Sequence, residues 1–273
     1  MTVTIIDDLD LKKIECSGQA FRIVQIHSGI FRFITGNHIL YIKNLGNHVF
    51  DIYDTTEDEW KEIWVPYFDL NRDYRSIRKS VPGDDSYLKQ AVEFGEGLRI
   101  LRQDPWEMLI TFIISQRKSI PAIKDSVERI CKKYGKCVKT SLEEIYLFPS
   151  AAEMANATQE ELRECKLGYR DTYIMDAISK ANSEIPDFDS MNNLTDNELF
   201  NKLKEIRGVG DKVANCICLF AYARTASAPV DTWIAKVINN YYGGVNPFPS
   251  YGDVAGIMQQ YIFYYAQTHK DEF

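Results

Sequence analysis

The stretch LKEIRGVGDKVANCICLFAYARTASAPVDTW, residues 203–233, carries the pattern that decides the fold. It predicts a helix, a tight Gly-x-Gly turn and a second helix, which together form a hairpin over 203–221. The glycines permit positive φ and leave backbone N–H groups uncovered at a helix N-terminus, where an oxyanion such as a phosphate binds. An ordinary bend between two helices is also compatible with this sequence. The turn residues predicted to bind are Gly208, Val209 and Gly210.

Two ionisable residues flank the second helix of this stretch. Lys212 lies in its first turn, where the helix dipole disfavours a positive charge and so favours a nucleophilic amine. The helix rises roughly 18 Å from 211 to 222, and the return loop RTASAPV spans up to roughly 23 Å when extended. Asp231 can therefore lie beside Lys212 as its charge partner. Capping the next helix is an equally ordinary role for Asp231.

The composition is that of a globular protein with enough chain for a sizeable core. It has 273 residues, of which 45% are hydrophobic and 26% charged. Neither a long apolar run nor a secretory signal is visible, so we expect a cytoplasmic, prokaryotic protein with no membrane partner. The cysteines are scattered without a CxxC pair, which favours reduced thiols over disulfides or structural zinc: Cys16, Cys131, Cys137, Cys165, Cys216 and Cys218.

Charge is spread unevenly along the chain. The net charge of −7 argues mildly against nucleic acid as a partner, and segment 51–62 is acidic. Segment 117–139, however, holds eight Lys or Arg residues against two acids. A local basic face of this kind can hold phosphates, and a solvated helix face explains the segment equally well.

The hydrophobic pattern changes period along the chain. Residues 3–53 alternate β-branched and aromatic runs with glycine turns, which predicts an antiparallel sheet. From about residue 84 the spacing is helical. We therefore expect an α+β protein with a β-rich N-terminal subdomain over 1–83 and an all-helical domain over 84–273. Predicted helix starts are Asp84, Asp104 followed by Pro105, and Thr195 with Glu198 in a capping box.

Six separated blocks resemble one known family. The chain resembles the helix-hairpin-helix (HhH-GPD) DNA glycosylases, and within them the 8-oxoguanine DNA glycosylase/AP lyases. That resemblance implies a TBP-like N-terminal sheet packed on a helical glycosylase core. The blocks are SGQAFR at 17–22, LRQDPWEMLITFIIS at 101–115, LGYR at 167–170, GVGDKVANCICLFA at 208–221, APVDTW at 228–233 and YGDVAGIMQQYIF at 251–263.

The resemblance implies roles for the residues that match. Lys212 would attack C1′ of the damaged nucleotide and form a Schiff base, and Asp231 would stabilise positive charge on the sugar. The Gly18 carbonyl would accept the N7–H that 8-oxoguanine has and guanine lacks, so that guanine would leave polar groups unpaired. Cys216 and Phe263 would sandwich the base, and Gln259 would read its Watson–Crick edge. Without the resemblance these would be two core residues, a surface glutamine and a turn glycine.

Other matching residues imply contacts to the duplex. Tyr169 would wedge into the stack and Arg170 would contact the opposite base, although LGYR also fits a helix end closed by glycine. Gln116 is a candidate to fill the gap left by the flipped base, and Arg117 a candidate DNA contact. Ala122 stands where the best-known members carry an arginine, which predicts a relaxed preference for the opposite base.

A second departure lies beside Asp231. A histidine that meets a phosphate often follows this aspartate, and this chain has Thr232 and Trp233 there. The predicted function is excision of 8-oxoguanine from double-stranded DNA and strand cleavage by β-elimination, by a monomer without metal or cofactor. The alternatives are a glycosylase for alkylated or mismatched bases and a non-catalytic DNA-binding module.

Overall fold

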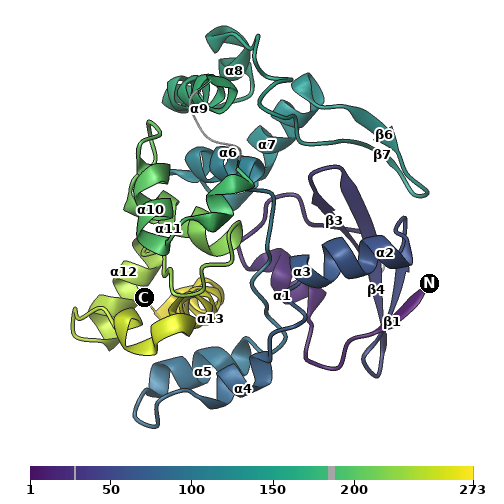
Figure 1. Cartoon of the computed structure of the whole chain (residues 1–273). Helices are drawn as coiled ribbons and strands as arrows, with labels where there is room; N and C mark the ends of the chain where they lie inside the picture. The colour runs from purple at the N-terminus through teal and green to yellow at the C-terminus, as the bar shows by residue number, and fades with distance from the viewer. Residues whose placement is uncertain (28, 184–187, 273) are drawn as a thin grey trace.

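The computed structural model describes residues 1–27, 29–183 and 188–272. A β-rich N-terminal part lies on one side of the molecule and the helices of the later chain on the other (Figure 1). The expected α+β architecture is confirmed. None of the helices in these described ranges is long and apolar enough to cross a membrane.

The N-terminal part is built on one antiparallel sheet. Its strand order is β1-β5-β4-β3-β2. A tight turn joins β3 to β4 and pairs Thr35 with His38, and Gly36 supplies the positive φ in that turn. Phe33 of β3 faces the core and contacts Phe68 edge-on, with ring centroids 4.9 Å apart. The strands are β1 (Thr2–Thr4), β2 (Val24–His27), β3 (Ile30–Thr35), β4 (His38–Gly46) and β5 (Val49–Tyr53).

Helical segments accompany this sheet. One of them runs without a break through a π-helical turn, and its buried Trp64 contacts Tyr67, with ring centroids 5.3 Å apart. These aromatic side chains join the sheet and its helices into one hydrophobic core. The segments are α1 (Leu11–Cys16), α2 (Glu57–Glu59), the π-helical turn Trp60–Trp64, α3 (Val65–Tyr67), α4 (Tyr74–Lys79) and α5 (Ser86–Phe94).

The remaining helices form the larger domain. The Asp104 carboxylate accepts a hydrogen bond from Glu107 N at 2.8 Å, and Thr195 and Glu198 form the expected capping box. The predicted cap at Asp84 was wrong by one residue, because the Asp85 carboxylate accepts from Leu88 N instead. The helices are α6 (Pro105–Ser115), α7 (Ile120–Tyr134), α8 (Gln159–Glu164), α9 (Asp171–Ser183), α10 (Asp196–Lys204), α11 (Asp211–Phe220), α12 (Thr232–Tyr241) and α13 (Ala255–Thr268), with 3₁₀ turns at Gly168–Arg170, Ser190–Asn193, Phe248–Val254 and Lys270–Glu272.

The expectation of an all-helical domain after residue 84 was wrong in one place. Strands β6 (Cys137–Lys139) and β7 (Glu144–Tyr146) form a hairpin that extends from the helices toward the N-terminal sheet (Figure 1). Ile145 packs against Ile34 of β3, and the Glu143 carboxylate pairs with Arg32 at 2.9 Å. These contacts with a distant part of the chain stabilise strands that are too short to form alone.

Candidate active site

The glycine turn between α10 and α11 has the geometry that its sequence predicts. Gly208 has φ +87°, and a Cβ there would lie 2.5 Å from the Tyr173 ring, so only glycine fits without movement. Gly210 is the N-cap residue of α11 and has extended φ and ψ, with open space around it. Val209 is buried and anchors the turn, with its N–H bonded to Ile206 O at 3.0 Å. The turn therefore presents backbone N–H groups at the start of α11.

The return loop brings Asp231 back to the start of α11. Asp231 caps α12, because its Oδ1 accepts a hydrogen bond from Ile234 N at 2.9 Å. It also lines the same small cavity as Lys212, which we call the lysine cavity. The capping role is thus confirmed, and the two ionisable groups share one site.

Lys212 is half-buried in the lysine cavity. Its Nζ lies 5.1 Å from the centroid of the Phe112 ring, a cation–π contact that holds the amine over α6. One helical turn further along α11, Cys216 is buried and its thiol contacts the Lys212 amine. Burial raises the pKa of the Cys216 thiol, and the smaller effect of the Lys212 charge lowers it. The sulfur therefore stays neutral and presents an apolar surface.

The four residues expected to contact the base all line the lysine cavity. Gly18, Cys216, Gln259 and Phe263 come together there from the loop after α1 and from helices α11 and α13. Gly18 has φ +73°, and a Cβ there would lie 3.1 Å from the Phe263 ring. Gln259 is only 3% exposed, and its Oε1 is buried without a hydrogen-bond partner among the described residues. An unpaired buried acceptor of this kind points to a ligand that donates to it.

A glutamine network that the sequence did not reveal fixes the Gly18 loop. Gln260 Nε2 donates to Ser17 O at 2.7 Å, so α13 holds the loop and also carries Gln259. On the other side of Gly18, Gln103 Nε2 donates to Gln19 O at 2.8 Å. All of these side chains are buried. The available signal was the adjacent pair of glutamines at 259 and 260, in the middle of the largely apolar run GIMQQYIFYYA at 256–266.

A wider groove opens from the lysine cavity. We call it the basic groove; its volume is about 980 Å³. Its charged lining residues are four cations, Arg117, Lys118, Lys212 and Lys270, and one carboxylate, Asp231. The chain as a whole is negative, yet this surface concentrates positive charge, as a polyanion requires. Arg117 is exposed here and has φ +52°, immediately after α6 ends.

The side chains of Gln116 and Arg170 both donate to backbone carbonyls rather than being free. Gln116 Nε2 donates to Gly208 O at 2.9 Å, which ties the end of α6 to the glycine turn. Arg170 is 5% exposed; its guanidinium donates to the Gln116 and Leu167 carbonyls. Tyr169 is 51% exposed, and the Arg170 guanidinium lies 4.4 Å from its ring centroid. Of the predicted LGYR contacts, the structure places the tyrosine on the surface and the arginine beneath it.

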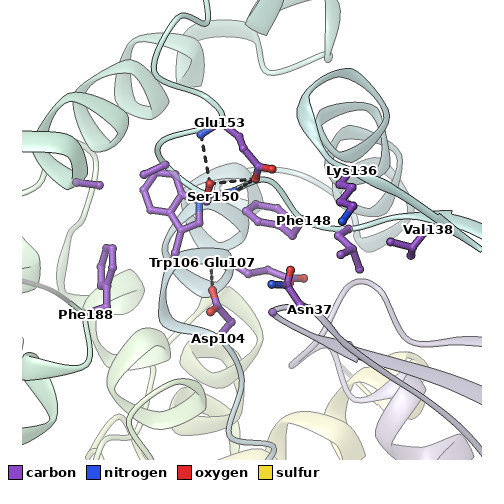
Figure 2. Close-up of a pocket in the computed structure, with 14 residues that line it drawn as sticks. Asn37, Asp104, Trp106, Glu107, Lys136, Val138, Phe148, Ser150, Glu153 and Phe188 are labelled. Atoms are coloured by element: carbon purple, nitrogen blue, oxygen red, sulfur yellow. Dashed lines mark hydrogen bonds between the residues drawn. The ribbon is translucent and has the colours of Figure 1, made fainter. Parts of the chain in front are cut away.

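A second cavity of about 790 Å³ lies at the other end of α6, and we call it the acidic cavity. Its charged lining residues are Asp104, Glu107, Glu153 and Lys136. Figure 2 shows Trp106, Phe148 and Glu107 between Phe188 on one side and Lys136 on the other. Burial raises the pKa of Glu107 to about 7. This cavity contains neither Lys212 nor Asp231.

Across the described ranges, no group of three or more His, Cys, Asp or Glu side chains is arranged to hold a metal ion. The polar groups of the lysine cavity are an amine, a carboxylate and amides.

Known proteins share both the sequence pattern and the fold. A model of the 8-oxoguanine DNA glycosylase N-terminal domain matches residues 3–109. A model of HhH-GPD superfamily base excision DNA repair proteins matches residues 110–262. The two matches meet within α6, and the boundary expected between 83 and 84 stays a prediction.

Several relatives match over most of the chain. A Clostridium acetobutylicum 8-oxoguanine glycosylase/lyase, solved with duplex DNA that contains cytosine opposite 8-oxoguanine, is 34% identical, with 98% of this chain and 95% of that chain covered and a TM-score of 0.91. MBOgg1, solved with a low-affinity DNA ligand, is 33% identical, with coverage of 98% and 96% and a TM-score of 0.93. A probable N-glycosylase/DNA lyase of Methanothermobacter thermautotrophicus is 28% identical over 229 residues, 73% of this chain and 72% of the relative. The chain therefore belongs to the 8-oxoguanine DNA glycosylase branch of the HhH-GPD superfamily of base excision DNA repair proteins.

Proposed function

We propose that this protein removes 8-oxoguanine from duplex DNA and then cleaves the strand at the resulting abasic site. The observation that carries the proposal is one cavity that holds an amine, a carboxylate and an unpaired amide oxygen, from Lys212, Asp231 and Gln259. The first two groups suit covalent attack on a sugar, and the third suits recognition of a base. The names of the relatives support the same pairing of glycosylase and lyase activity.

The covalent step uses the Lys212 amine in its neutral form. Its Nζ attacks C1′ of the flipped nucleotide, and the C1′–N9 bond breaks with its electron pair on the base, which takes up a proton. Asp231 stabilises the positive charge that develops on the sugar as the base leaves. Opening of the sugar ring gives a Schiff base, and loss of a C2′ proton then expels the 3′ phosphate by β-elimination.

Recognition of the base relies on the walls of the lysine cavity. The Gly18 carbonyl accepts N7–H of 8-oxoguanine, the Gln259 amide reads the Watson–Crick edge, and Cys216 and Phe263 cover the two faces of the ring. The cavity measures about 50 Å³, which is room for about one or two water molecules. Phe263, which is only partly buried, must therefore swing aside before a base can enter.

Contacts to the rest of the duplex follow from the surface around the groove. Tyr169, which is exposed, inserts into the stack and offsets part of the cost of flipping. We expect the glycine turn and Arg117 to contact the DNA backbone, and Gln116 to fill the gap left by the flipped base. Arg170 reaches the opposite base only if it leaves the carbonyls that it now binds. Ala122 offers no hydrogen bond to that base, so we expect a relaxed preference for the opposite base.

Borohydride trapping on a duplex that carries 8-oxoguanine tests this function. The wild-type protein should form a covalent adduct and release the free base, and Lys212→Gln should form none. Lys204→Gln is the matched control, because Lys204 lies on the same hairpin but pairs with Asp211 at 2.6 Å outside the cavity. An undiminished adduct in Lys212→Gln would disprove the role of the lysine. Release of alkylated purines but not of 8-oxoguanine would show a different substrate.

A further inference from the structure

One indole on the edge of the basic groove is in contact with two lysines. Trp233 lies in the first turn of α12, two residues after Asp231. The Lys236 Nζ lies 5.0 Å from the centroid of its ring, and the Lys270 Nζ lies 5.9 Å from it. Lys236 belongs to the same helix, but Lys270 follows α13, so separate segments of the chain bring the two charges to one ring.

This cluster adjoins the reactive amine. Trp233 and Lys270 line the basic groove together with Lys212 and Asp231. The C-terminal end of the chain, which carries Lys270, lies beside α12 and α13 (Figure 1). Arg117 and Lys118 line the same groove. A strand that places a sugar at Lys212 would occupy a groove that the indole also lines.

We propose that Trp233, Lys236 and Lys270 form a clamp for the lesion-bearing strand next to the flipped nucleotide. The inference rests on the proposed function, since it concerns the strand that this site would hold. The Trp233 ring stacks on a neighbouring base, and the two ammonium groups bind the phosphates on either side of it. The ligand class is a single strand of DNA backbone within a duplex.

The chemistry of the three groups fits this task. An aromatic ring stacks on any base regardless of its identity, because every base has a π-face. Ammonium groups bind phosphate as point charges and release condensed counterions when they do. Both lysines are exposed, so they reach the phosphates at little cost in desolvation. The cation–π contacts keep the two ammonium groups over the ring before DNA arrives, and a base that stacks on the indole displaces them toward the flanking phosphates.

A purely local role for the cluster makes a different prediction. The Trp233–Lys236 contact spans three residues of one helix, and contacts of that spacing stabilise helices without any ligand. In that case substitution would lower the melting temperature and leave DNA binding unchanged. Measuring DNA binding by folded variants therefore distinguishes a strand clamp from a cluster that only stabilises the helix.

The experiment measures affinity against salt for a labelled duplex with one 8-oxoguanine. All variants are made in the Lys212→Gln background, so that the DNA stays intact. Lys236→Gln and Lys270→Gln should each lower the slope of log affinity against log salt by about 0.9. Trp233→Ala should weaken binding about tenfold with little change of slope, since stacking is nearly independent of salt. The matched control is Lys61→Gln, whose lysine is exposed and pairs with Glu57 far from the groove.

Tryptophan fluorescence gives a second readout. Trp60, Trp64 and Trp106 are buried, at 7%, 0% and 7% exposed, so DNA should quench Trp233 alone. Quenching should therefore disappear in Trp233→Phe, which keeps a ring but no indole. Equal slopes for Lys236→Gln, Lys270→Gln and Lys61→Gln, or full quenching in Trp233→Phe, would overturn the clamp.

Measuring base release by the wild-type protein separates the clamp proposal from the proposed function on which it rests. Base release with unchanged slopes in the lysine variants would remove the clamp and keep the function. Lowered slopes without base release would keep the clamp as a DNA-binding surface and remove the proposed chemistry.

Discussion

The two ends of helix α6 lie in opposite electrostatic environments. Its C-terminal end lines the basic groove, where four cations face one carboxylate. Its N-terminal end lines the acidic cavity, where three carboxylates face one lysine. This arrangement matches the helix dipole, whose positive end is at the N-terminus. A net charge of −7 is therefore a poor guide to what any one surface binds.

The two ends also differ in how their polar groups are bonded. In the acidic cavity the Asp104 carboxylate caps α6, and the Glu153 carboxylate accepts from Ser150 N at 2.7 Å. In the lysine cavity the Gln259 Oε1 is buried and unpaired among the described residues. We infer that side chains at the acidic end of α6 affect the stability of the fold and that those at the basic end carry the chemistry. Substitutions at each end test that division.

The largest effect is expected at the basic end. Gln259→Leu should lower the single-turnover rate on 8-oxoguanine by roughly 100-fold, because the base edge loses its partner in a buried site. Cleavage of a duplex with a preformed abasic site should change far less, since that substrate has no base to read. Equal losses on both substrates would mean that Gln259 acts on the covalent step.

An intermediate effect, on stability alone, is expected at the acidic end. Glu107 ionises less readily in the folded protein, where burial raises its pKa from 4.5 to about 7. Its protonated form stabilises the fold below pH 4.5, and that stability is lost as the pH rises toward 7. Glu107→Gln should therefore increase the free energy of unfolding at pH 8 by roughly 1–3 kcal/mol.

The same variant should match the wild-type chain near pH 4. Urea denaturation at both pH values measures the difference. A loss of stability at pH 8 would show that attraction to Arg22, which lowers the pKa of Glu107, matters more than burial. Altered DNA affinity at unchanged stability would contradict the division between the two ends.

The smallest effect concerns the helix cap itself. Asp104→Ala should cost about 1 kcal/mol of unfolding free energy, because Glu107 N loses its acceptor at the start of α6. Asp104→Asn keeps an acceptor oxygen and should recover most of the loss. Neither change should alter the rate of base release once both proteins are folded. Equal destabilisation by alanine and asparagine would assign the effect to the charge of Asp104 instead.

The sequence predicted what depends on local pattern. Lys212 at the start of α11, the cap at Asp231 and the glycine turn follow from spacing and residue type, and the family resemblance supplied Gly18, Gln259 and Phe263. The β6–β7 hairpin was missed because its strands are short and depend on Arg32 and Ile34, far away in the chain. The environment of Arg170 was also inaccessible, since two carbonyls from different segments bind it.

The hydrogen bond from Gln260 to Ser17 joins residues that are 243 positions apart. During synthesis the loop that carries Gly18 is therefore made early but gains this support only after α13 has left the ribosome. Gln259 lies on that same helix, so this wall of the lysine cavity also reaches the Gly18 loop late. A chain made only as far as α12 therefore has Lys212 and the cations of segment 117–139 but lacks two walls of the lysine cavity, Gln259 and Phe263.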